Sequence, residues 1–150
     1  MNPMIEGKKK CAIFGFCDIR NFTDTTEELQ EGVMMFVNEI AQIIHGLVDK
    51  YFGAANKNIG DAFLMVWKFK PNEFSFSDDL IFRNPESKRA FYIPDLALLS
   101  FIKIYCKLNK DPNILKYRNH PKLIQRMPGY EVKMGFGLHL GWAIEGAIGS

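Results

Sequence analysis

Apolar and polar residues follow one another along this chain in blocks that predict both strands and helices. Residues 11–17 form a nearly unbroken apolar run, which is typical of a strand in the interior of a sheet. Thr25 and Glu28 stand at the spacing of a capping box, so we expect a helix to begin near there. Residues 33–51 carry apolar side chains at helical spacing, which predicts a long amphipathic helix that Gly53 would end.

The middle of the chain predicts a hairpin followed by a less regular region. Residues 54–59 and 62–67 are strand-like and flank Gly60-Asp61, which would form the turn. Residues 68–93 mix prolines and polar residues with isolated aromatic residues, so we expect a long surface excursion.

The last third of the chain predicts a helix and two more strands. Residues 95–109 are amphipathic, residues 110–131 read as loop or short helix, and residues 132–140 and 142–148 predict strands joined by a turn at Gly141. The face of the helix that we expect to be buried carries Leu96, Leu99, Ile102 and Cys106. The order of elements predicts an α/β (α+β) sandwich, with a mainly antiparallel sheet and helices on one face.

Composition limits the class of protein. A chain of 150 residues, 47% hydrophobic and 24% charged, can form one globular domain. The net charge is only +2 and no basic stripe is present, so a nucleic-acid partner is not favoured. Three cysteines without paired spacing favour reduced thiols and an intracellular location. No apolar run predicts a signal peptide or a membrane contact from this segment, although a longer parent protein could be membrane-anchored or ciliary.

Two aspartates at the ends of apolar runs are the strongest chemical feature. Asp18 ends the first run, and Asp61 interrupts the predicted hairpin. Magnesium prefers oxygen ligands and is often held by one or two carboxylates together with substrate phosphates. A helix start after Asp18 would supply N–H groups for those phosphates. Each aspartate taken singly could instead be a turn or cap residue, and Lys57 a solvated surface lysine.

Three blocks together give a resemblance to a known family. They are Phe16-Cys-Asp-Ile-Arg-Asn-Phe-Thr23, Lys57-Asn-Ile-Gly-Asp61, and Gly137-Leu-His-Leu-Gly141 continuing to Ser150. In this order they resemble the catalytic domain of class III adenylyl and guanylyl cyclases. The residues of the three blocks are most similar to those of protist or algal members. The fold implied is the ferredoxin-like sandwich of that family. Residues 68–93 have no counterpart in the resemblance and would be an insertion.

The resemblance implies a metal site with two ions, Mg²⁺ or Mn²⁺. Asp18 and Asp61 match the metal-binding aspartates, and the backbone carbonyl of Ile19 matches a third ligand. The reaction implied is attack of the ribose 3′-hydroxyl on the α-phosphate, with pyrophosphate as the leaving group.

The same resemblance implies the substrate contacts. Phe22 and Thr23 fall in the segment whose amides hold the phosphates, and Gly60 lies in the second block beside the substrate. Lys57 matches the position that reads the purine, where lysine goes with adenine because it donates to N1. ATP is therefore expected over GTP, with a second cyclase domain as homodimer or heterodimer partner.

The chain departs from the family pattern in two respects that concern catalysis. An Asp and an Asn…Arg pair would follow the last block, and residues 1–150 contain no match to them, so no catalytic residue is assigned within the chain. Several cyclases also carry an arginine where Gly135 stands here. We therefore expect a partial catalytic domain that is inactive alone. The alternative is a non-catalytic cyclase-like domain that acts as a regulatory or structural partner.

Overall fold

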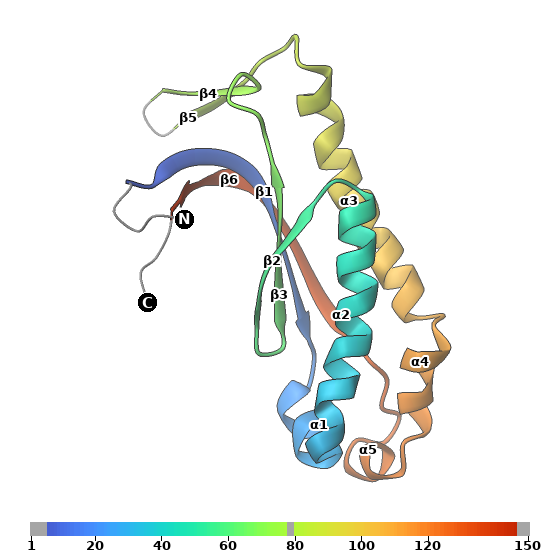
Figure 1. The fold of residues 1–150 in the computed structure, drawn as a ribbon. Coiled ribbons are helices and arrows are strands. Elements are labelled where there is room, and N and C mark those ends of the chain that lie inside the picture. Colours follow the sequence, from blue (N-terminus) through green and yellow to red (C-terminus); the bar gives the residue numbers. More distant parts are fainter. Residues whose placement is uncertain (1–5, 78–79, 147–150) are drawn as a thin grey trace.

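A four-stranded antiparallel sheet with helices packed on one face forms the body of the molecule (Figure 1). The computed structural model describes residues 6–77 and 80–146. The strand order is β2-β3-β1-β6, and a separate hairpin is formed by β4 and β5. This arrangement confirms the predicted α+β sandwich. The elements are β1 (Lys8–Ile19), α1 (Phe22–Leu29), η1 (Gln30–Gly32), α2 (Val33–Lys50), β2 (Ala54–Ile59), β3 (Ala62–Lys68), β4 (Phe74–Ser77), β5 (Leu80–Arg83), α3 (Lys88–Leu108), α4 (Pro112–Leu115), η2 (Lys116–Asn119), α5 (Pro121–Arg126) and β6 (Met134–Glu145).

The hydrophobic core lies between the sheet and the two long helices α2 and α3. Strand β3 contributes Met65 and Trp67, and α2 contributes Phe36 and Ile44, all fully buried. The other face of the sheet is open, since Phe16 in the central strand β1 is 45% exposed. The sheet therefore has one buried face and one accessible face, as antiparallel sheets commonly do.

Strand β6 corrects the prediction of two strands at the end of the chain. Residues 132–140 and 142–148 do not form a hairpin; a single strand runs from Met134 to Glu145, and Ile148 lies outside the described residues. Gly141 is buried in mid-strand opposite Ala12 of β1. Because β1 begins at Lys8, it offers a backbone partner to every residue of β6, and a turn at Gly141 would break that ladder.

Helix α1 begins three residues before the predicted start at Thr25. Its N-cap is Asn21, which has a left-handed backbone (φ 56°) and no side-chain cap. Thr25 lies inside the helix, where its hydroxyl donates to the Asn21 carbonyl at 2.9 Å. The same hydroxyl lies 3.1 Å from the Tyr130 hydroxyl, so Thr25 ties α1 to the segment before β6.

Helix α2 matches its prediction, but Gly53 acts differently from a helix-ending glycine. The left-handed residue after α2 is Phe52 (φ 63°), and Gly53 N donates to the Val48 carbonyl at 2.9 Å. A Cβ at Gly53 would lie 2.7 Å from both Trp67 Nε1 and Val48 Cγ1. Glycine is therefore required for close packing, because any side chain would collide with the core.

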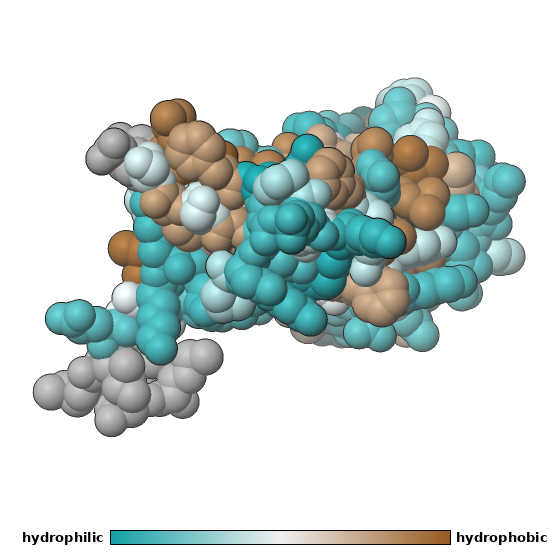
Figure 2. All heavy atoms as spheres, turned by 90° about the horizontal axis from the view of Figure 1, so that it is seen from above, coloured by the Kyte–Doolittle hydropathy of each residue, from teal (hydrophilic) through white to brown (hydrophobic). Residues whose placement is uncertain are grey.

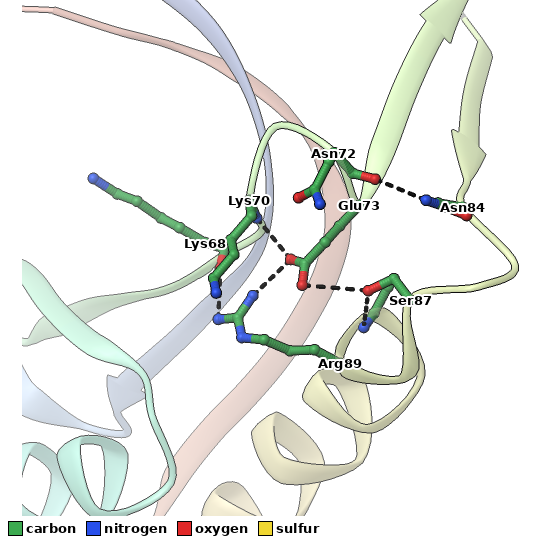
Figure 3. Close-up of polar contacts among 8 residues, drawn as sticks. Lys68, Lys70, Asn72, Glu73, Asn84, Ser87 and Arg89 are labelled. Carbon is green, nitrogen blue, oxygen red and sulfur yellow. Dashed lines mark hydrogen bonds and ion pairs between the residues drawn. The ribbon is translucent and has the colours of Figure 1, made fainter.

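Part of the predicted excursion at residues 68–93 is ordered secondary structure, namely β4, β5 and the first turns of α3. Glu73, only 3% exposed, fixes this region to the helix (Figure 3). Its carboxylate accepts from Lys70 N at 2.7 Å, from Arg89 Nη1 at 2.6 Å and from Ser87 Oγ at 3.4 Å. A buried carboxylate with three donors is stably accommodated. That the region is an insertion stays a prediction.

Helix α3 differs from its prediction in both start and buried face. It begins at Lys88 and passes through Pro94, whereas the predicted start was Asp95. Leu99 and Ile102, predicted to be buried, are 37% and 50% exposed, and Cys106 is exposed. The side chains that α3 buries are Ala90, Ile93, Ala97, Ser100, Phe101, Ile104 and Leu108.

Residues 110–131, predicted as loop or short helix, contain the short helices α4, η2 and α5. Seen from the end that carries β4 and β5, the surface shows apolar patches on two sides of a hydrophilic centre (Figure 2). Among the described residues, no helix is long and apolar enough to cross a membrane.

Candidate functional site

Backbone pairing brings the two aspartates together at one end of the sheet. Asp18 is the last but one residue of β1 and stands opposite Ala62 of β3. Ile19 N donates to the Asp61 carbonyl at 3.1 Å, which fixes the β2–β3 turn beside the end of β1. The turn itself depends on Gly60, whose φ of +59° favours glycine.

A cleft of about 490 Å³ opens at this junction. Both aspartates line it, together with Arg20, the Asn21–Thr23 turn and Asp24. The cleft thus combines the end of a strand, a hairpin turn and the start of α1. Such a combination can hold a cation and an anionic ligand side by side.

The three aspartates that line the cleft differ in how their charges are paired. Asp24 is paired with Arg126 at 2.8 Å. Arg20 Nε lies 3.2 Å from Asp18 Oδ1 and forms an ion pair with it, without a hydrogen bond to that oxygen. Within the described residues, Asp18 Oδ1 is therefore a buried oxygen with no hydrogen-bond partner, and Asp61 makes no ion pair. A buried oxygen left in this way is costly unless something binds it.

The donor set fits a hard divalent cation. No cluster of three or more His, Cys, Asp or Glu side chains occurs in the part of the chain that the structure describes. A metal here would be held by the Asp18 and Asp61 carboxylates, with the Ile19 carbonyl and substrate oxygens completing the shell, as is usual for Mg²⁺.

The start of α1 offers free backbone donors to the same cleft. The first helical hydrogen bond runs from Thr25 N to the Asn21 carbonyl, and no side chain caps the helix. The N–H groups of residues 22–24 therefore have no partner in the described structure, as expected for the first turn of a helix. Phe22 and Thr23, predicted to contact phosphates, both line the cleft.

Lys57 and Gly60, by contrast, do not line the cleft. Lys57 is exposed on the edge strand β2, next to an irregularity in its pairing with β3. Its partner is Leu64, which in turn stands opposite Phe16 of β1. Lys57 therefore lies on the same open face of the sheet as Phe16 and as Asp18, which is two residues after Phe16 in β1.

Sequence reasoning missed Arg20, Asn21 and Asp24 as parts of the site. All three lie within six residues of Asp18, so proximity in sequence was the available signal. Their types, two charged residues and one amide, are common on any surface and did not distinguish them.

Comparison with known proteins shows the family. The family model described as the adenylate and guanylate cyclase catalytic domain matches residues 4–150, so the chain belongs to this family. No curated protein matches the sequence significantly.

Solved structures show the same fold. A bacterial light-regulated adenylyl cyclase is similar with a TM-score of 0.67 at 23% identity, covering 100% of this chain and 36% of that chain. The adenylyl cyclase CyaB from P. aeruginosa gives 0.67 at 20% identity, covering 97% and 63%. The guanylyl cyclase domain of the RhoGC fusion protein from Blastocladiella emersonii gives 0.62 at 19% identity, covering 98% and 66%. This chain therefore spans less than two thirds of the length of each of these three solved chains.

Proposed function

We propose that this chain is part of a purine nucleotide cyclase that converts ATP to cyclic AMP and pyrophosphate at a dimer interface. The observation that carries the proposal is the convergence of Asp18, Asp61 and the free N–H groups of α1 on one cleft. Membership of the cyclase family supports the reaction class.

The carboxylates and the backbone amides of the cleft have different proposed roles, metal binding and phosphate binding. Asp18 and Asp61 would hold two divalent cations, Mg²⁺ or Mn²⁺, together with the Ile19 carbonyl. When bound, these ions would activate the 3′-hydroxyl and stabilise the departing pyrophosphate. The backbone amides of Phe22 and Thr23 bind the triphosphate, because a helix N-terminus favours anions. The new bond joins the 3′-oxygen to the α-phosphorus as the bond to the pyrophosphate oxygen breaks.

Substrate selection is assigned to the β2–β3 hairpin. Lys57 donates to adenine N1, an acceptor that guanine lacks because its N1 carries a hydrogen. Gly60 sets the turn that keeps Asp61 beside Asp18. A second cyclase domain takes part in the site, as the family resemblance implies, and we expect no turnover from this chain alone.

The alternative function is that of a non-catalytic cyclase-like domain that regulates or supports a partner. An Asn…Arg pair after the last block of the natural full-length protein would favour the enzyme over this alternative. The two functions differ in metal chemistry, since a purely structural partner has no need of a cation between Asp18 and Asp61.

The experiment is Mn²⁺ binding to the purified chain, followed by electron paramagnetic resonance. We expect Asp18→Asn and Asp61→Asn each to weaken Mn²⁺ binding by about tenfold or more, since each removes a charged ligand. Asp49→Asn, an exposed aspartate of α2 outside the cleft, is the matched control and should have no effect. Equal binding by all four proteins would favour the non-catalytic function.

Turnover is then measured in the natural full-length protein with Mg²⁺ and with Mn²⁺. Asp18→Ala should abolish formation of cyclic AMP while the free energy of unfolding changes little, because Asp18 Oδ1 has no hydrogen-bond partner to lose and its ion pair is with the largely exposed Arg20. Persistent turnover in this variant would contradict the two-metal assignment.

A further inference from the structure

Gly135 and Arg20 both lie next to the Asp18 carboxylate. In the ladder between β1 and β6, Gly135 stands directly opposite Asp18. A Cβ at Gly135 would lie 2.7 Å from Arg20 Cζ and 2.9 Å from Asp18 Oδ1. Real side chains do not approach so closely, so the guanidinium occupies the space that the missing side chain leaves.

The arrangement places a cation at the oxygen where a metal would bind. Arg20 Nε lies 3.2 Å from Asp18 Oδ1, and this oxygen has no hydrogen-bond partner in the described structure. Among the described residues that line the cleft, Arg20 is the single basic side chain, and three are aspartates. The Arg20 side chain is 60% exposed and that of Asp18 is 31% exposed, so the pair lies at the surface although Oδ1 itself is buried.

We propose that Arg20 is a built-in counter-ion of Asp18, displaced when a divalent cation binds, and that Gly135 provides its resting place. The inference rests on the metal role proposed for Asp18. Arg20 acts through Asp18 and is a positioning residue: it neutralises the carboxylate and holds it in place until the metal arrives.

The physical reason is that the guanidinium and a metal ion are like charges that repel each other at close range and compete for the same carboxylate. Displacing the guanidinium from Asp18 lowers the affinity for the metal. Exposed ion pairs are weak because water and salt screen them. The competition is therefore modest and reversible, which suits a site that has to admit and release its ligand.

The experiment compares Mn²⁺ dissociation constants for variants of the purified chain. We expect Arg20→Ala to bind Mn²⁺ about two- to fivefold more tightly, which is the range that a surface ion pair allows. Arg20→Lys keeps the charge and should lie closer to wild type than to Arg20→Ala. Arg126→Ala is the matched control: it removes an arginine paired with Asp24 of the same cleft and should stay within about twofold of wild type.

A double-mutant cycle tests the part played by Gly135. Gly135→Ala should itself tighten Mn²⁺ binding, because the methyl group meets Arg20 Nη2 more closely than it meets Asp18 Oδ1 and pushes the guanidinium away. In the Arg20→Ala background the same change should have no further effect. Persistence of the full effect in that background would show that residue 135 acts on Asp18 directly and would overturn the assignment.

Other results separate this inference from the proposed function. Unchanged or weaker Mn²⁺ binding by Arg20→Ala, or an equal gain in Arg126→Ala, would overturn the counter-ion while leaving an Asp18-dependent metal site intact. Mn²⁺ binding that is absent from every variant would overturn both proposals. Thermal unfolding of each variant is recorded alongside, and Arg20→Ala should keep the wild-type midpoint, since an exposed pair adds little stability.

Discussion

The thiol of Cys17 precedes the proposed metal ligand Asp18 but points to the other side of the sheet. It is fully buried, and burial together with the neighbouring Asp18 charge raises the pKa of Cys17 to about 12. Burial also raises the pKa of Cys11 to about 11. Cys106 is exposed on α3. Because the thiolate is the reactive form, the three cysteines should differ sharply in reactivity.

Alkylation tests this residue-level environment. At pH 8 we expect iodoacetamide to modify Cys106 in the folded protein, while Cys11 and Cys17 stay protonated, shielded and unmodified. All three should react in urea. Mass spectrometry of the digested protein gives the extent at each site, and rapid native labelling of Cys17 would mean that the end of β1 opens to solvent.

Lys57 is the residue proposed to select adenine over guanine in the substrate. We expect Lys57→Glu in the full-length protein to lower kcat/KM for ATP by about tenfold, since a donor to adenine N1 is replaced by an acceptor. GTP use need not appear, because a single position does not rebuild the pocket. Lys50→Glu, an equal charge change at the end of α2, is the control. Wild-type turnover of GTP as fast as ATP would contradict the assignment.

Single residues show what the sequence could predict about the site. Asp18 and Asp61 were identifiable because each interrupts an apolar run, and the structure places both on one cleft. The closeness of Arg20 to Gly135 could not be predicted, because it depends on the register between β1 and β6. Register is a tertiary property that no local pattern contains.

At the level of elements, Glu73 joins the segment after β3 to the start of α3. Its partner Arg89 also donates from Nη2 to the Lys68 carbonyl at 3.2 Å, and Asn84 Nδ2 donates to the Asn72 carbonyl at 3.0 Å (Figure 3). These contacts explain how a region rich in polar residues and prolines is held against the core.

Removal of the Glu73 carboxylate should therefore be costly. We expect Glu73→Ala to lower the free energy of unfolding by about 2–3 kcal/mol, because three hydrogen bonds are lost while the partly exposed Arg89 keeps some hydration. Glu86→Ala, an exposed glutamate in the same loop, should change it by less than about 0.5 kcal/mol. Urea denaturation measures both, and equal values would remove Glu73 as an anchor.

The elements that the sequence mispredicted share a physical cause. In α3, apolar residues occupy more than one face, so periodicity alone could not choose the stripe that Ile93, Ala97 and Ile104 bury. Pro94 suggested a boundary, yet the N-cap Ser87 and the buried Ala90 begin the helix earlier. In β6, Gly141 resembled a turn, whereas pairing with β1 determined the strand. Tertiary contacts outweighed local preference in each case.

For the whole molecule, the sheet and α3 leave an apolar surface uncovered. β6 is the outermost strand of the four-stranded sheet, so one of its edges is unpaired among the described residues. Beside it, a groove of about 350 Å³ is lined by Leu98, Phe101, Ile102, Tyr105, Phe136 and Leu138. Further along the strand, Trp142 and Ile144 are 44% and 69% exposed. Long edge strands with apolar neighbours promote pairing between chains.

We therefore expect the purified chain to associate with a second copy through the α3–β6 surface as its concentration rises. Ile102→Glu and Leu138→Glu, which place charges on the helix and strand sides of the groove, should each shift the equilibrium towards monomer. Met34→Glu is the matched control, since Met34 is 67% exposed but belongs to α2. Sedimentation equilibrium gives the association constant, and circular dichroism checks that each variant is folded. A chain that stays monomeric at high concentration, or that Met34→Glu dissociates equally well, would show that this surface does not drive association.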